Sequence, residues 1–453
     1  MNRARVARRL ARAMPKTVTL DEREAPVLAE ADVVVVGGGS AGLAAAISSA
    51  RSGSRTVLVE RYGFFGGNAT AAWVGTICGL YRKTADGFDR VCQGFAGEWA
   101  DGIVSMGMGG GPVPFKETAV FLYVPWAYKF HADRLVTAEE NLTPLLHCSV
   151  TEVARAGSSI DAVVVGSKRG PLAITAPVFI DASGDADVVH HAGLGTDMGG
   201  AGQRQFPSMQ FLMQNVDVGA AYAAGLDKLQ ELLQTTGREW GLSRTGGAVL
   251  PTSRQGEMYG AMTRIGVDGH SPDMTDPFEA TAAEIAGRAE AEKAGRFLIE
   301  NMPGFENAYF ADTPTQLGVR ETRRARGDYE LTGSDVLGAA RFDDAIAAGA
   351  WPQEFHVEGT ETQYVWLDEG AYYQVPYRSL LVQGVDNLLV AGRCISATHE
   401  ALASTRVIAP SMAQGEAAGV AAAMAARTGT TLRALDVGAV QNELRARGAF
   451  IGE

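Results

Sequence analysis

The chain has 453 residues, 46% hydrophobic and 20% charged, a composition typical of a globular protein large enough for more than one domain. Its formal net charge of −12 gives a surface that repels phosphate backbones, which argues against a nucleic-acid partner. The four cysteines are widely spaced and form no CxxC pair, so we expect no iron–sulfur cluster and no metal site. Free thiols favour a reducing, cytoplasmic location.

The first 27 residues are expected to form an N-terminal arm. Residues 1–16 carry five arginines and one lysine, and a polar segment follows in place of the apolar run that an export signal needs. We expect a solvated arm or a short surface helix, with an assembly or targeting role as the alternative. The uncharged run 33–50 has the length of a membrane span, but "GGGSAG" interrupts it. We therefore expect no membrane span.

A glycine-rich turn begins the first recognisable structural unit. Residues 33–36 are four consecutive valines, which indicates a buried parallel strand. Gly37, Gly39 and Gly42 then form G-x-G-x-x-G ahead of an alanine-rich helix over 43–52. Such glycines permit a tight turn, close approach of the backbone to a pyrophosphate and close helix–strand packing. The helix N-terminus favours the phosphate charge.

An acidic residue completes this unit. The segment 56–60, "TVLVE", predicts a second strand that ends at Glu60. A carboxylate at that place accepts hydrogen bonds from ribose hydroxyls and repels a 2′-phosphate. The glycine motif alone is a weak signal, but the complete strand–turn–helix–strand–acid order predicts a dinucleotide site, which also includes Ser40 and Ala41.

Further elements follow in chain order. Residues 101–115 are rich in glycine and are expected to form a surface loop, with a mobile lid over a pocket as the alternative. The sequence then predicts strands within 162–167, 172–188 and 387–392, helices over 135–146, 281–302 and 409–427, and a short C-terminal helix. Since parts of one nucleotide-binding fold lie near both ends of the chain, the middle is expected to be an excursion from it.

Four later motifs resemble the glutathione-reductase-like superfamily of FAD proteins. "GGNAT" (66–70) resembles the loop that closes over FAD, and "VFIDASGDAD" (178–187) resembles a strand ending in Ala-Thr-Gly, with Ser183 in place of threonine. "GVDNLLVAGRCIS" (384–396) is similar to the strand before the flavin ring, and "SMAQGEAAG" (411–419) resembles the helix whose N-terminus faces that ring. The resemblance implies FAD as the cofactor. Besides the residues named above, it implies as cofactor-binding residues Arg61, Gly66, Gly67, Asn68, Ala69, Ala182, Gly184, Asp185, Gly392, Arg393, Gly415 and Ala418.

Three further sequence blocks narrow the resemblance to one family within this superfamily. "GVRETRRARGDYELTGSDV" (318–336), "YQVPYRSL" (373–380) and "THEALASTRVIAPSMAQGEAAG" (398–419) resemble the generic FAD-dependent oxidoreductase family, in which an arginine-rich block, a Y-x-x-P-Y-R block and an H-x-A-x-x-S-x-R block recur. This family is functionally diverse. The resemblance therefore implies redox chemistry and no particular substrate.

Four residues are candidate catalytic residues. A cation and a helix N-terminus stabilise negative charge on a reduced flavin, which favours Arg406, just before the helix 409–427. His399 is a candidate general acid or base, and Arg320 is a candidate clamp for a substrate carboxylate or phosphate. Tyr373 is a candidate pocket residue. The alternative for each is structural, as an ion pair, a hydrogen-bonded core histidine or a packed aromatic residue.

These features predict an FAD-dependent oxidoreductase that transfers hydride between a small or medium organic substrate and flavin N5, as a dehydrogenase or oxidase. The acceptor is left open among O₂, a quinone and a protein. Three alternatives remain: reduction of an activated C=C in a carboxylate substrate, monooxygenation, and a non-catalytic or electron-transfer subunit. A homodimer is the default expectation. Covalent attachment of the flavin also stays open, with His399 and Cys394 as the residues concerned.

The expected fold class is α/β, with a discontinuous Rossmann-like FAD-binding domain and an inserted mixed α+β substrate domain. The FAD-binding domain is expected to comprise residues 28–100, 131–204 and 380–430. The substrate domain is assigned to 205–379, with 101–130 as an excursion near the pocket. An arm at 1–27 and a C-terminal helix within 431–453 complete the expected organisation.

Overall fold

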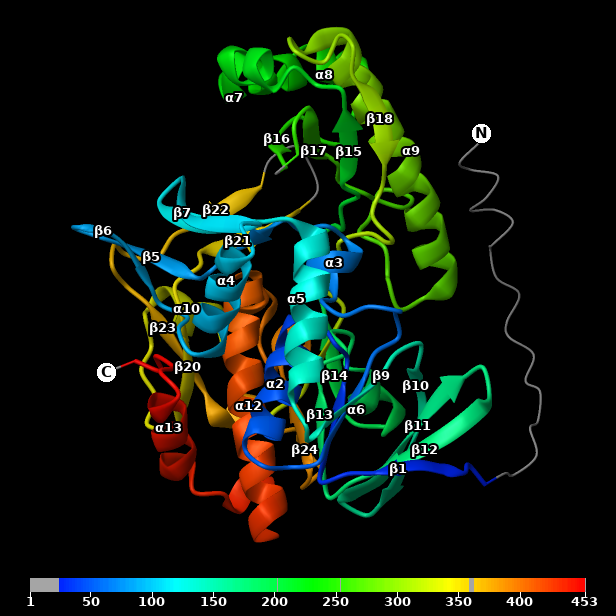
Figure 1. Ribbon diagram of the computed structural model, residues 1–453, viewed down its shortest axis with the longest axis vertical. Coiled ribbons are helices and arrows are strands. Elements are labelled where there is room, and N and C mark those ends of the chain that lie inside the picture. The colour runs from blue at the N-terminus through cyan, green and yellow to red at the C-terminus, as the bar shows by residue number, and fades with distance from the viewer. Residues whose placement is uncertain (1–23, 202, 253, 358–361, 453) are drawn as a thin grey trace. The chain divides into compact units, whose positions relative to one another are not determined.

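The computed structural model describes residues 24–201, 203–252, 254–357 and 362–452 (Figure 1). Most of the expected N-terminal arm, residues 1–23, lies outside the described residues. The chain divides into two units of close contacts. The larger contains residues 26–202, 320–355 and 363–453, and the smaller contains 203–319 and 356–362.

A five-stranded parallel sheet forms the centre of the larger unit. Its strand order is β24-β13-β2-β3-β9, and every neighbouring pair is parallel. The strands come from distant parts of the chain: β2 (Val33–Val36), β3 (Thr56–Val59), β9 (Leu142–Leu145), β13 (Val178–Asp181) and β24 (Leu388–Val390). The predicted α/β class, the Rossmann-like parallel sheet and its assembly from separated segments are confirmed.

Both faces of this sheet are buried, which explains the unbroken run of valines in β2. Val33 and Val35 pack into one core with α2 and α12, whereas Val34 and Val36 pack into a second core. The second core includes a four-stranded sheet of order β1-β12-β11-β10. Successive side chains of a strand point to opposite faces, so a strand covered on both sides must be apolar throughout.

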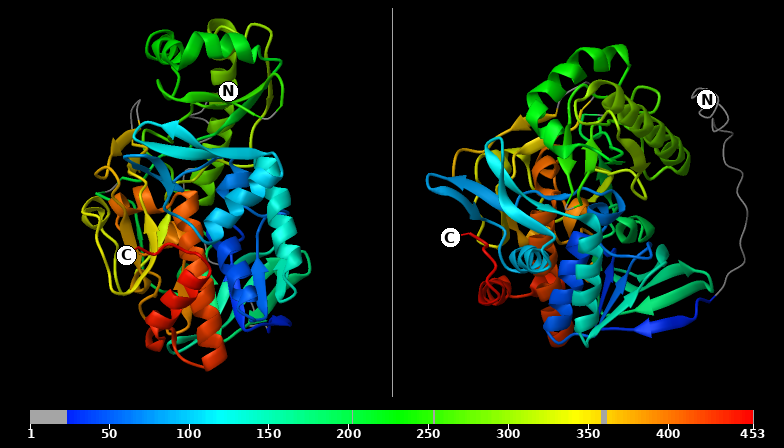
Figure 2. Two further views of the ribbon diagram at one scale, coloured as in Figure 1. Left: turned by 60° about the vertical axis from the view of Figure 1, so that its left-hand side comes forward. Right: turned by 45° about the horizontal axis from the view of Figure 1, so that its top comes forward.

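Two alanine- and glycine-rich helices, α2 (Ser40–Arg51) and α12 (Ile408–Thr428), lie against each other (Figure 2). A Cβ atom added at Gly415 would lie 2.0 Å from the carbonyl oxygen of Ala41, and one at Gly419 would lie 2.2 Å from that of Ala45. Only glycine allows the two backbones to approach so closely. The resulting contact ties the first βα unit to the late segment of the chain.

Shorter elements surround this core. The other strands and helices of the larger unit are β1 (Val27–Glu30), α3 (Asn68–Ala71), β4 (Thr76–Ile77), β5 (Tyr81–Thr84), β6 (Gly87–Arg90), α4 (Phe95–Ser105), β7 (Gly109–Phe115), β8 (Thr118–Tyr123), α5 (Pro125–Ala138), β10 (Ser149–Ala156), β11 (Ser159–Ser167), β12 (Gly170–Thr175), α6 (Asp187–His191), β14 (Thr196–Met198), β19 (Arg323–Ala325), α10 (Gly333–Leu337), β20 (Ala345–Gly349), β21 (Gln353–Phe355), β22 (Gln363–Val365), β23 (Tyr373–Pro376), α11 (His399–Thr405) and α13 (Val437–Ala446). Short 3₁₀ turns lie at η1 (Tyr377–Ser379), η2 (Gly392–Cys394) and η3 (Leu432–Ala434).

Two local predictions were wrong. The expected helix at 135–146 is the end of α5 followed by strand β9, because the sheet recruits 142–145 as its edge strand beside β3. The glycine-rich stretch 101–115 is not a loop. It forms the end of α4 and strand β7, which pairs with β8 through the backbone and needs no particular side chains.

The smaller unit contains an antiparallel sheet of order β16-β17-β15-β18 and three helices. Its elements are β15 (Phe211–Gln214), α7 (Val218–Gln234), α8 (Thr236–Glu239), β16 (Ala248–Pro251), β17 (Glu257–Ala261), α9 (Pro277–Asn301) and β18 (Tyr309–Asp312). Helix α9 begins at Pro277 because the Asp276 carboxylate accepts hydrogen bonds from the N–H groups of Phe278 and Glu279, at 2.9 and 3.1 Å.

The division by contacts differs from the domain boundaries expected from the sequence. The expected substrate domain extended to residue 379, but 320–355 and 363–379 belong to the larger unit. Strands β20 and β23 pair with each other, and their side chains join the core that contains α12. The segment 101–130 likewise lies in the larger unit.

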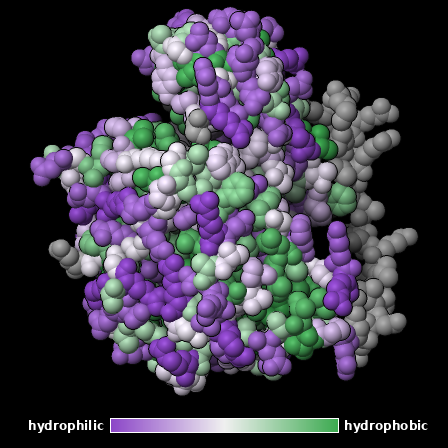
Figure 3. Space-filling model, viewed as in Figure 1, coloured by the Kyte–Doolittle hydropathy of each residue, from purple (hydrophilic) through white to green (hydrophobic). Residues whose placement is uncertain are grey.

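Polar and charged side chains cover most of the face seen in Figure 3, in agreement with the composition. Among the residues that the structure describes, no helix has both the length and the apolar character required to cross a bilayer.

Candidate functional site

The predicted glycine turn lies between β2 and α2. Gly37 has φ +98°, and a Cβ atom there would lie 2.4 Å from the carbonyl oxygen of Ala182. A Cβ atom at Gly42 would lie 1.7 Å from the carbonyl oxygen of Gly37. Both positions therefore require glycine, one for the turn and the other for contact between helix and turn. Ala182, from the motif after β13, forms the neighbouring wall.

The second glycine loop lies directly against the first. Gly66 and Gly67 have φ of +116° and +53°, and Gly66 forms a bridge with Gly39. A Cβ atom at Gly67 would lie 3.0 Å from the Cα of Gly39. The two loops thus present backbone to each other with no side chain between them. Helix α3 begins after this loop with Asn68 and the buried Ala69.

The N-terminus of α2 is open to an anion. Its N-cap residue, Gly39, has no side chain to cap the first N–H groups. The adjacent Ser40 hydroxyl is 2.8 Å from the hydroxyl of Tyr128, a fully buried residue of α5, which holds it in place. Ala41 is buried beneath the turn. Uncapped N–H groups at the positive end of a helix dipole are the usual site for a pyrophosphate.

Glu60 lies beside this turn at the end of β3. Its side-chain carboxylate accepts the Gly38 N–H at 2.7 Å with Oε2 and the Tyr62 N–H at 2.8 Å with Oε1. Burial raises its pKa, an effect that the two N–H groups oppose. Because a carboxylate has about four acceptor positions, both oxygens keep capacity for ribose hydroxyls. The structure thus places the acid where the dinucleotide fingerprint requires it.

A charged network joins three of the predicted cofactor residues. Asp185 accepts a hydrogen bond from Arg393 at 2.8 Å, and Arg61 lies 3.6 Å from its other oxygen. Thr322 donates to Asp185 at 2.7 Å and accepts from Arg393 at 2.7 Å. Burial alone would raise the pKa of Asp185, but the two guanidinium groups hold it below its ordinary value. Gly184, with φ +79°, leaves room for Arg393.

A hydrogen bond to Gln414 of α12 fixes the loop at Gly392. Its N–H donates to the Gln414 amide oxygen at 2.9 Å, and the Gln414 NH₂ donates to the hydroxyl of Thr405 at 2.7 Å. A Cβ atom at Gly392 would lie 2.8 Å from the Cβ of Ala41. Gly415 and Ala418 lie about two to three turns inside α12 and are buried. Gly415 packs against the backbone of α2 at Ala41, a contact that explains the glycine at this position.

His399 belongs to a buried charged cluster. Its Nδ1 lies 2.8 and 3.0 Å from the two carboxylate oxygens of Glu321. Arg324 donates to the same carboxylate at 2.6 Å. The side chain of Glu321 is fully buried, whereas that of His399 is 10% exposed. Arg324, Glu321 and His399 thus form one hydrogen-bonded cluster, with the carboxylate between the guanidinium and the imidazole.

Arg406 ends α11 and precedes α12. It donates to the backbone carbonyl of Glu354 at 3.3 Å. Burial lowers its pKa, and the Glu354 and Glu321 carboxylates partly compensate. Cys78 lies in the same region, where its carbonyl accepts the Ala409 N–H at 3.2 Å. Burial raises the pKa of the Cys78 thiol to about 12, so this thiol stays protonated near neutral pH.

Three other residues named in the sequence analysis, Arg320, Tyr373 and Cys394, are buried to different degrees. Arg320 is partly buried on the loop before β19. Tyr373 is fully buried in β23, where its hydroxyl lies 2.9 Å from that of Ser404, an arrangement that favours packing over contact with a substrate. Cys394 is also fully buried, with its thiol 3.3 Å from the Asp181 carbonyl oxygen. A covalent flavin link at this cysteine does not fit such burial.

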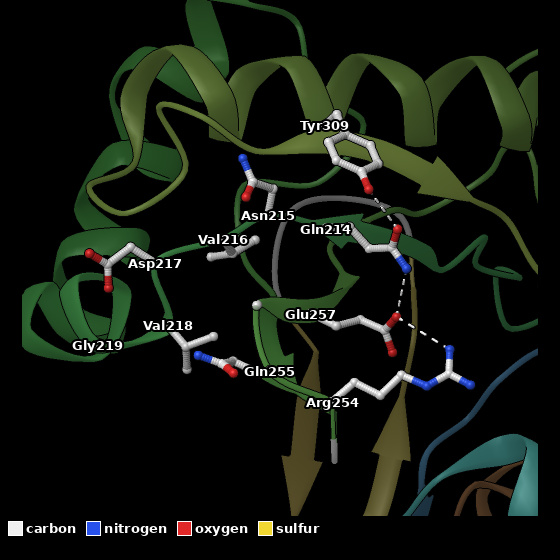
Figure 4. Close-up of a pocket in the computed structure, with 11 residues that line it drawn as sticks. Gln214, Asn215, Val216, Asp217, Val218, Gly219, Arg254, Gln255, Glu257 and Tyr309 are labelled. Atoms are coloured by element: carbon white, nitrogen blue, oxygen red, sulfur yellow. Dashed lines mark hydrogen bonds and ion pairs between the residues drawn. The ribbon is translucent and has the colours of Figure 1, made fainter.

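A separate pocket of about 750 Å³ lies within the smaller unit, between the end of β15, the start of α7 and the turn before β17 (Figure 4). The Tyr309 hydroxyl donates to Gln214 at 3.0 Å, and the Gln214 amide donates to Glu257 at 2.9 Å. None of the predicted site residues lines this pocket. Among the described residues, no group of three or more His, Cys, Asp or Glu is placed to hold a metal ion.

Comparison with known families identifies the chain. The model of the family described as FAD dependent oxidoreductase matches residues 32–444. The chain belongs to the FAD-dependent oxidoreductase family. The match covers the glycine turn, the charged network, the His399 cluster and α12, and it confirms the predicted family, the enzyme class and FAD as the cofactor.

Solved structures show only remote similarity to this FAD-dependent oxidoreductase. A geranylgeranyl bacteriochlorophyll reductase-like protein from Thermoplasma acidophilum is 14% identical, with a TM-score of 0.48 over 92% of this chain and 84% of that one. The p-nitrophenol 4-monooxygenase PnpA from Pseudomonas putida is 12% identical, with a TM-score of 0.44 over 94% and 90%. GidA from Aquifex aeolicus is 13% identical, with a TM-score of 0.46 over 92% and 67%. No curated protein matches the sequence.

The residues at the glycine turn fit FAD. A cofactor pyrophosphate requires a backbone surface free of side chains, and added Cβ atoms would fill that surface at Gly37 and Gly67. The adenosine ribose requires a hydrogen-bond acceptor, and the Glu60 carboxylate beside the turn is a group of that kind. The site therefore has the chemistry that the family membership demands.

Sequence reasoning did not assign a role to several residues that organise the site. Glu321, Thr322 and Arg324 lie in the arginine-rich block 318–336, from which only Arg320 was named as a candidate site residue. Gln414 lies within the α12 motif. Glu321 and Arg324 are three residues apart in the sequence, a spacing that could have indicated their internal ion pair.

Proposed function

We propose that this FAD-dependent oxidoreductase dehydrogenates a small or medium organic molecule, with His399 taking the proton that the substrate loses. When bound, FAD supplies the acceptor for the hydride. The electron acceptor that completes the cycle is left to experiment. The proposal extends the family membership to a direction of reaction and to a named base.

The surroundings of the His399 imidazole provide the main support. Its Nδ1 is bonded to a buried carboxylate, and among the described residues its Nε2 has no hydrogen-bond partner. A ring held at one nitrogen with the other nitrogen unbonded has the arrangement of a general base. The His399 side chain is 10% exposed, whereas the Glu321 side chain is fully buried.

Arg406 supports the same reaction by its charge. The guanidinium stays protonated although burial lowers its pKa, because arginine loses its proton only at very high pH. It lies between α11 and the N-terminus of α12, so the cation and the helix dipole act together. Both would stabilise the negative charge that bound FAD would take up with the hydride.

The alternative of reducing a carboxylate substrate draws less support from the arginine-rich block. Arg323 pairs with Asp187 at 2.7 Å, and Arg324 pairs with Glu321 at 2.6 Å. Two of the three arginines within residues 320–324 are therefore engaged in internal ion pairs. Dehydrogenation remains the favoured interpretation.

The proposal is tested by loss of flavin colour without air. The purified protein is precipitated with acid first, and FAD in the supernatant shows non-covalent binding. The holoenzyme is then mixed anaerobically with alcohols, hydroxy acids and amines. At least one donor should bleach the flavin, and His399→Gln should slow bleaching by about a hundredfold or more. A variant that bleaches at the wild-type rate would remove His399 as the base.

A further inference from the structure

We propose that Glu321, held by Arg324, is the positioning residue that decides which ring nitrogen of His399 carries the proton. This inference rests on the proposed function, because it explains how His399 keeps Nε2 ready to accept a proton. Glu321 itself need touch neither substrate nor cofactor. Its role is to fix the tautomer of the imidazole and to stabilise the imidazolium that forms.

The first step of the argument is that Glu321 cannot turn. Its carboxylate is fully buried and accepts hydrogen bonds from Arg324 and from His399 Nδ1. Arg324 is itself fixed by two backbone carbonyls, that of Ala397 at 2.6 Å and that of Gly199 at 2.9 Å. A guanidinium anchored in this way holds the carboxylate in one orientation.

The second step is that the imidazole ring is also confined. Phe355 stacks on it with ring centroids 5.6 Å apart and an interplanar angle of 28°. Gly200 lies so close that an added Cβ atom would be 2.5 Å from the Cβ of His399. His399 is the first residue of α11, where the Thr398 hydroxyl accepts the Ala401 N–H and sets the helix start. The ring therefore has little freedom to exchange its two nitrogens.

The third step concerns the proton. A carboxylate only accepts hydrogen bonds, so the neutral imidazole must donate from Nδ1 and keep its lone pair on Nε2. When Nε2 takes a proton, the negative carboxylate stabilises the imidazolium. Arg324 compensates the charge of the Glu321 carboxylate in the interior by an ion pair at 2.6 Å.

Glu321→Gln separates this role from simple packing. Arg324 can only donate, so it requires the oxygen of the new side-chain amide. Arg324 bonds Oε1, so Oε1 corresponds to the amide oxygen and the NH₂ takes the place of Oε2, which lies 2.8 Å from His399 Nδ1. Nδ1 can accept from this NH₂ only when its proton moves to Nε2. The substitution thus preserves size and burial but favours the tautomer that cannot act as a base. Glu416→Gln is the matched control, since Glu416 is similarly buried and contacts α4 instead.

The direct test is ¹⁵N NMR of the histidine rings in the FAD-loaded protein, which has seven histidines. The His399 signals are identified by their loss in His399→Gln. Wild type and Glu416→Gln should carry the proton on Nδ1, and Glu321→Gln should carry it on Nε2. A wild-type His399 with its proton on Nε2 overturns the inference, even if Glu321→Gln does not fold. So does an unchanged tautomer in a folded Glu321→Gln.

A kinetic measurement distinguishes this inference from the proposed function. With the donor that bleaches the flavin fastest, Glu321→Gln should lower the limiting bleaching rate about 10²- to 10⁴-fold, with little change in the half-saturating donor concentration. Failure of the proposed function appears as a His399→Gln variant of full activity. Failure of the inference appears as a slow His399→Gln beside a fully active Glu321→Gln.

Discussion

At the residue scale, the chemistry of this protein depends on buried carboxylates with unequal surroundings. Glu60 accepts two backbone N–H groups, Glu321 lies between a guanidinium and an imidazole, and Glu416 has a single N–H partner in the described contacts. The cost of burying each charge depends on how many donors surround it. The three residues therefore respond differently to removal of their charge.

Glu60→Gln should weaken FAD binding. Glutamine has one oxygen to satisfy the N–H groups of Gly38 and Tyr62, so its NH₂ must face one of them. That amide orientation removes one acceptor oxygen and the negative charge that a ribose hydroxyl of FAD would bond, and a hydrogen bond to a charged group is worth about 1.5–3 kcal/mol, equivalent to a roughly tenfold to hundredfold weaker affinity. Titration of the apoprotein with FAD, followed by fluorescence, measures the change. Glu443→Gln, at a partly exposed ion pair with Arg447, should bind FAD as wild type does. Equal affinities for both variants would exclude Glu60 from the site.

Glu416 should make stability depend on pH. Burial raises its pKa to about 7, with Glu98 adding to the shift and the Phe95 N–H, Arg447 and Arg51 opposing it. Because the pKa is raised in the folded state, the contribution to stability is complete below about pH 4.5 and is lost as pH rises to about 7. The loss is about 3 kcal/mol at most.

Urea unfolding of wild type and Glu416→Gln between pH 5 and pH 8 measures this effect. The variant should be the more stable protein at pH 8, and the difference should shrink toward pH 5. Glu443→Gln serves as a control that keeps the wild-type pH dependence. A constant difference between Glu416→Gln and wild type over the whole range would show that the carboxyl does not titrate there.

At the element scale, the sequence predicted the elements that allow only a few residue types, namely the buried strands of the central sheet and the glycine turn after β2. The strands β2 and β24 are continuous apolar runs, and β3 and β13 are apolar except for Thr56 and Asp181. The turn after β2 needs glycine because added Cβ atoms would clash there. The prediction of a helix at 135–146 was wrong because β9, "LTPL", pairs with β3. This pairing depends on tertiary structure, and the four residues of β9 alone do not indicate it. Strand β7 was missed because its glycines pair through backbone groups alone.

Gly415→Ala should disrupt the contact of α2 with α12. The new Cβ would lie 2.0 Å from the Ala41 carbonyl, so the helices must separate, at a cost of about 1–3 kcal/mol. Gly110→Ala is the control, because a Cβ atom there has no atom within 4 Å. Urea unfolding at neutral pH compares the two. If Gly415→Ala is as stable as Gly110→Ala, the close approach of the helices is not required for the fold.

At the scale of the whole molecule, the division of the chain was the hardest feature to foresee. The mixed segment 320–379 resembles the region before it in composition, yet Ile346, Ala347 and Val375 complete the core around α12. Only the three-dimensional packing shows this. The candidate site was predicted unevenly for the same reason. The glycines and Glu60 follow from local motifs, whereas the pairing of Glu321 with His399 joins residues 78 positions apart.

This assembly from distant segments should make FAD a strong stabiliser of the larger unit. The turn at Gly37, the loop at Gly67 and the network around Asp185 come together only in the folded chain, so FAD has no site in the unfolded state. Binding then stabilises by about 2.7 kcal/mol at a free FAD concentration about one hundred times the Kd. Urea unfolding of apoprotein and holoprotein should show a higher midpoint with FAD, and AMP at the same concentration should give a smaller shift because it lacks the flavin half. Equal midpoints for apoprotein and holoprotein would mean that these segments do not form the FAD site.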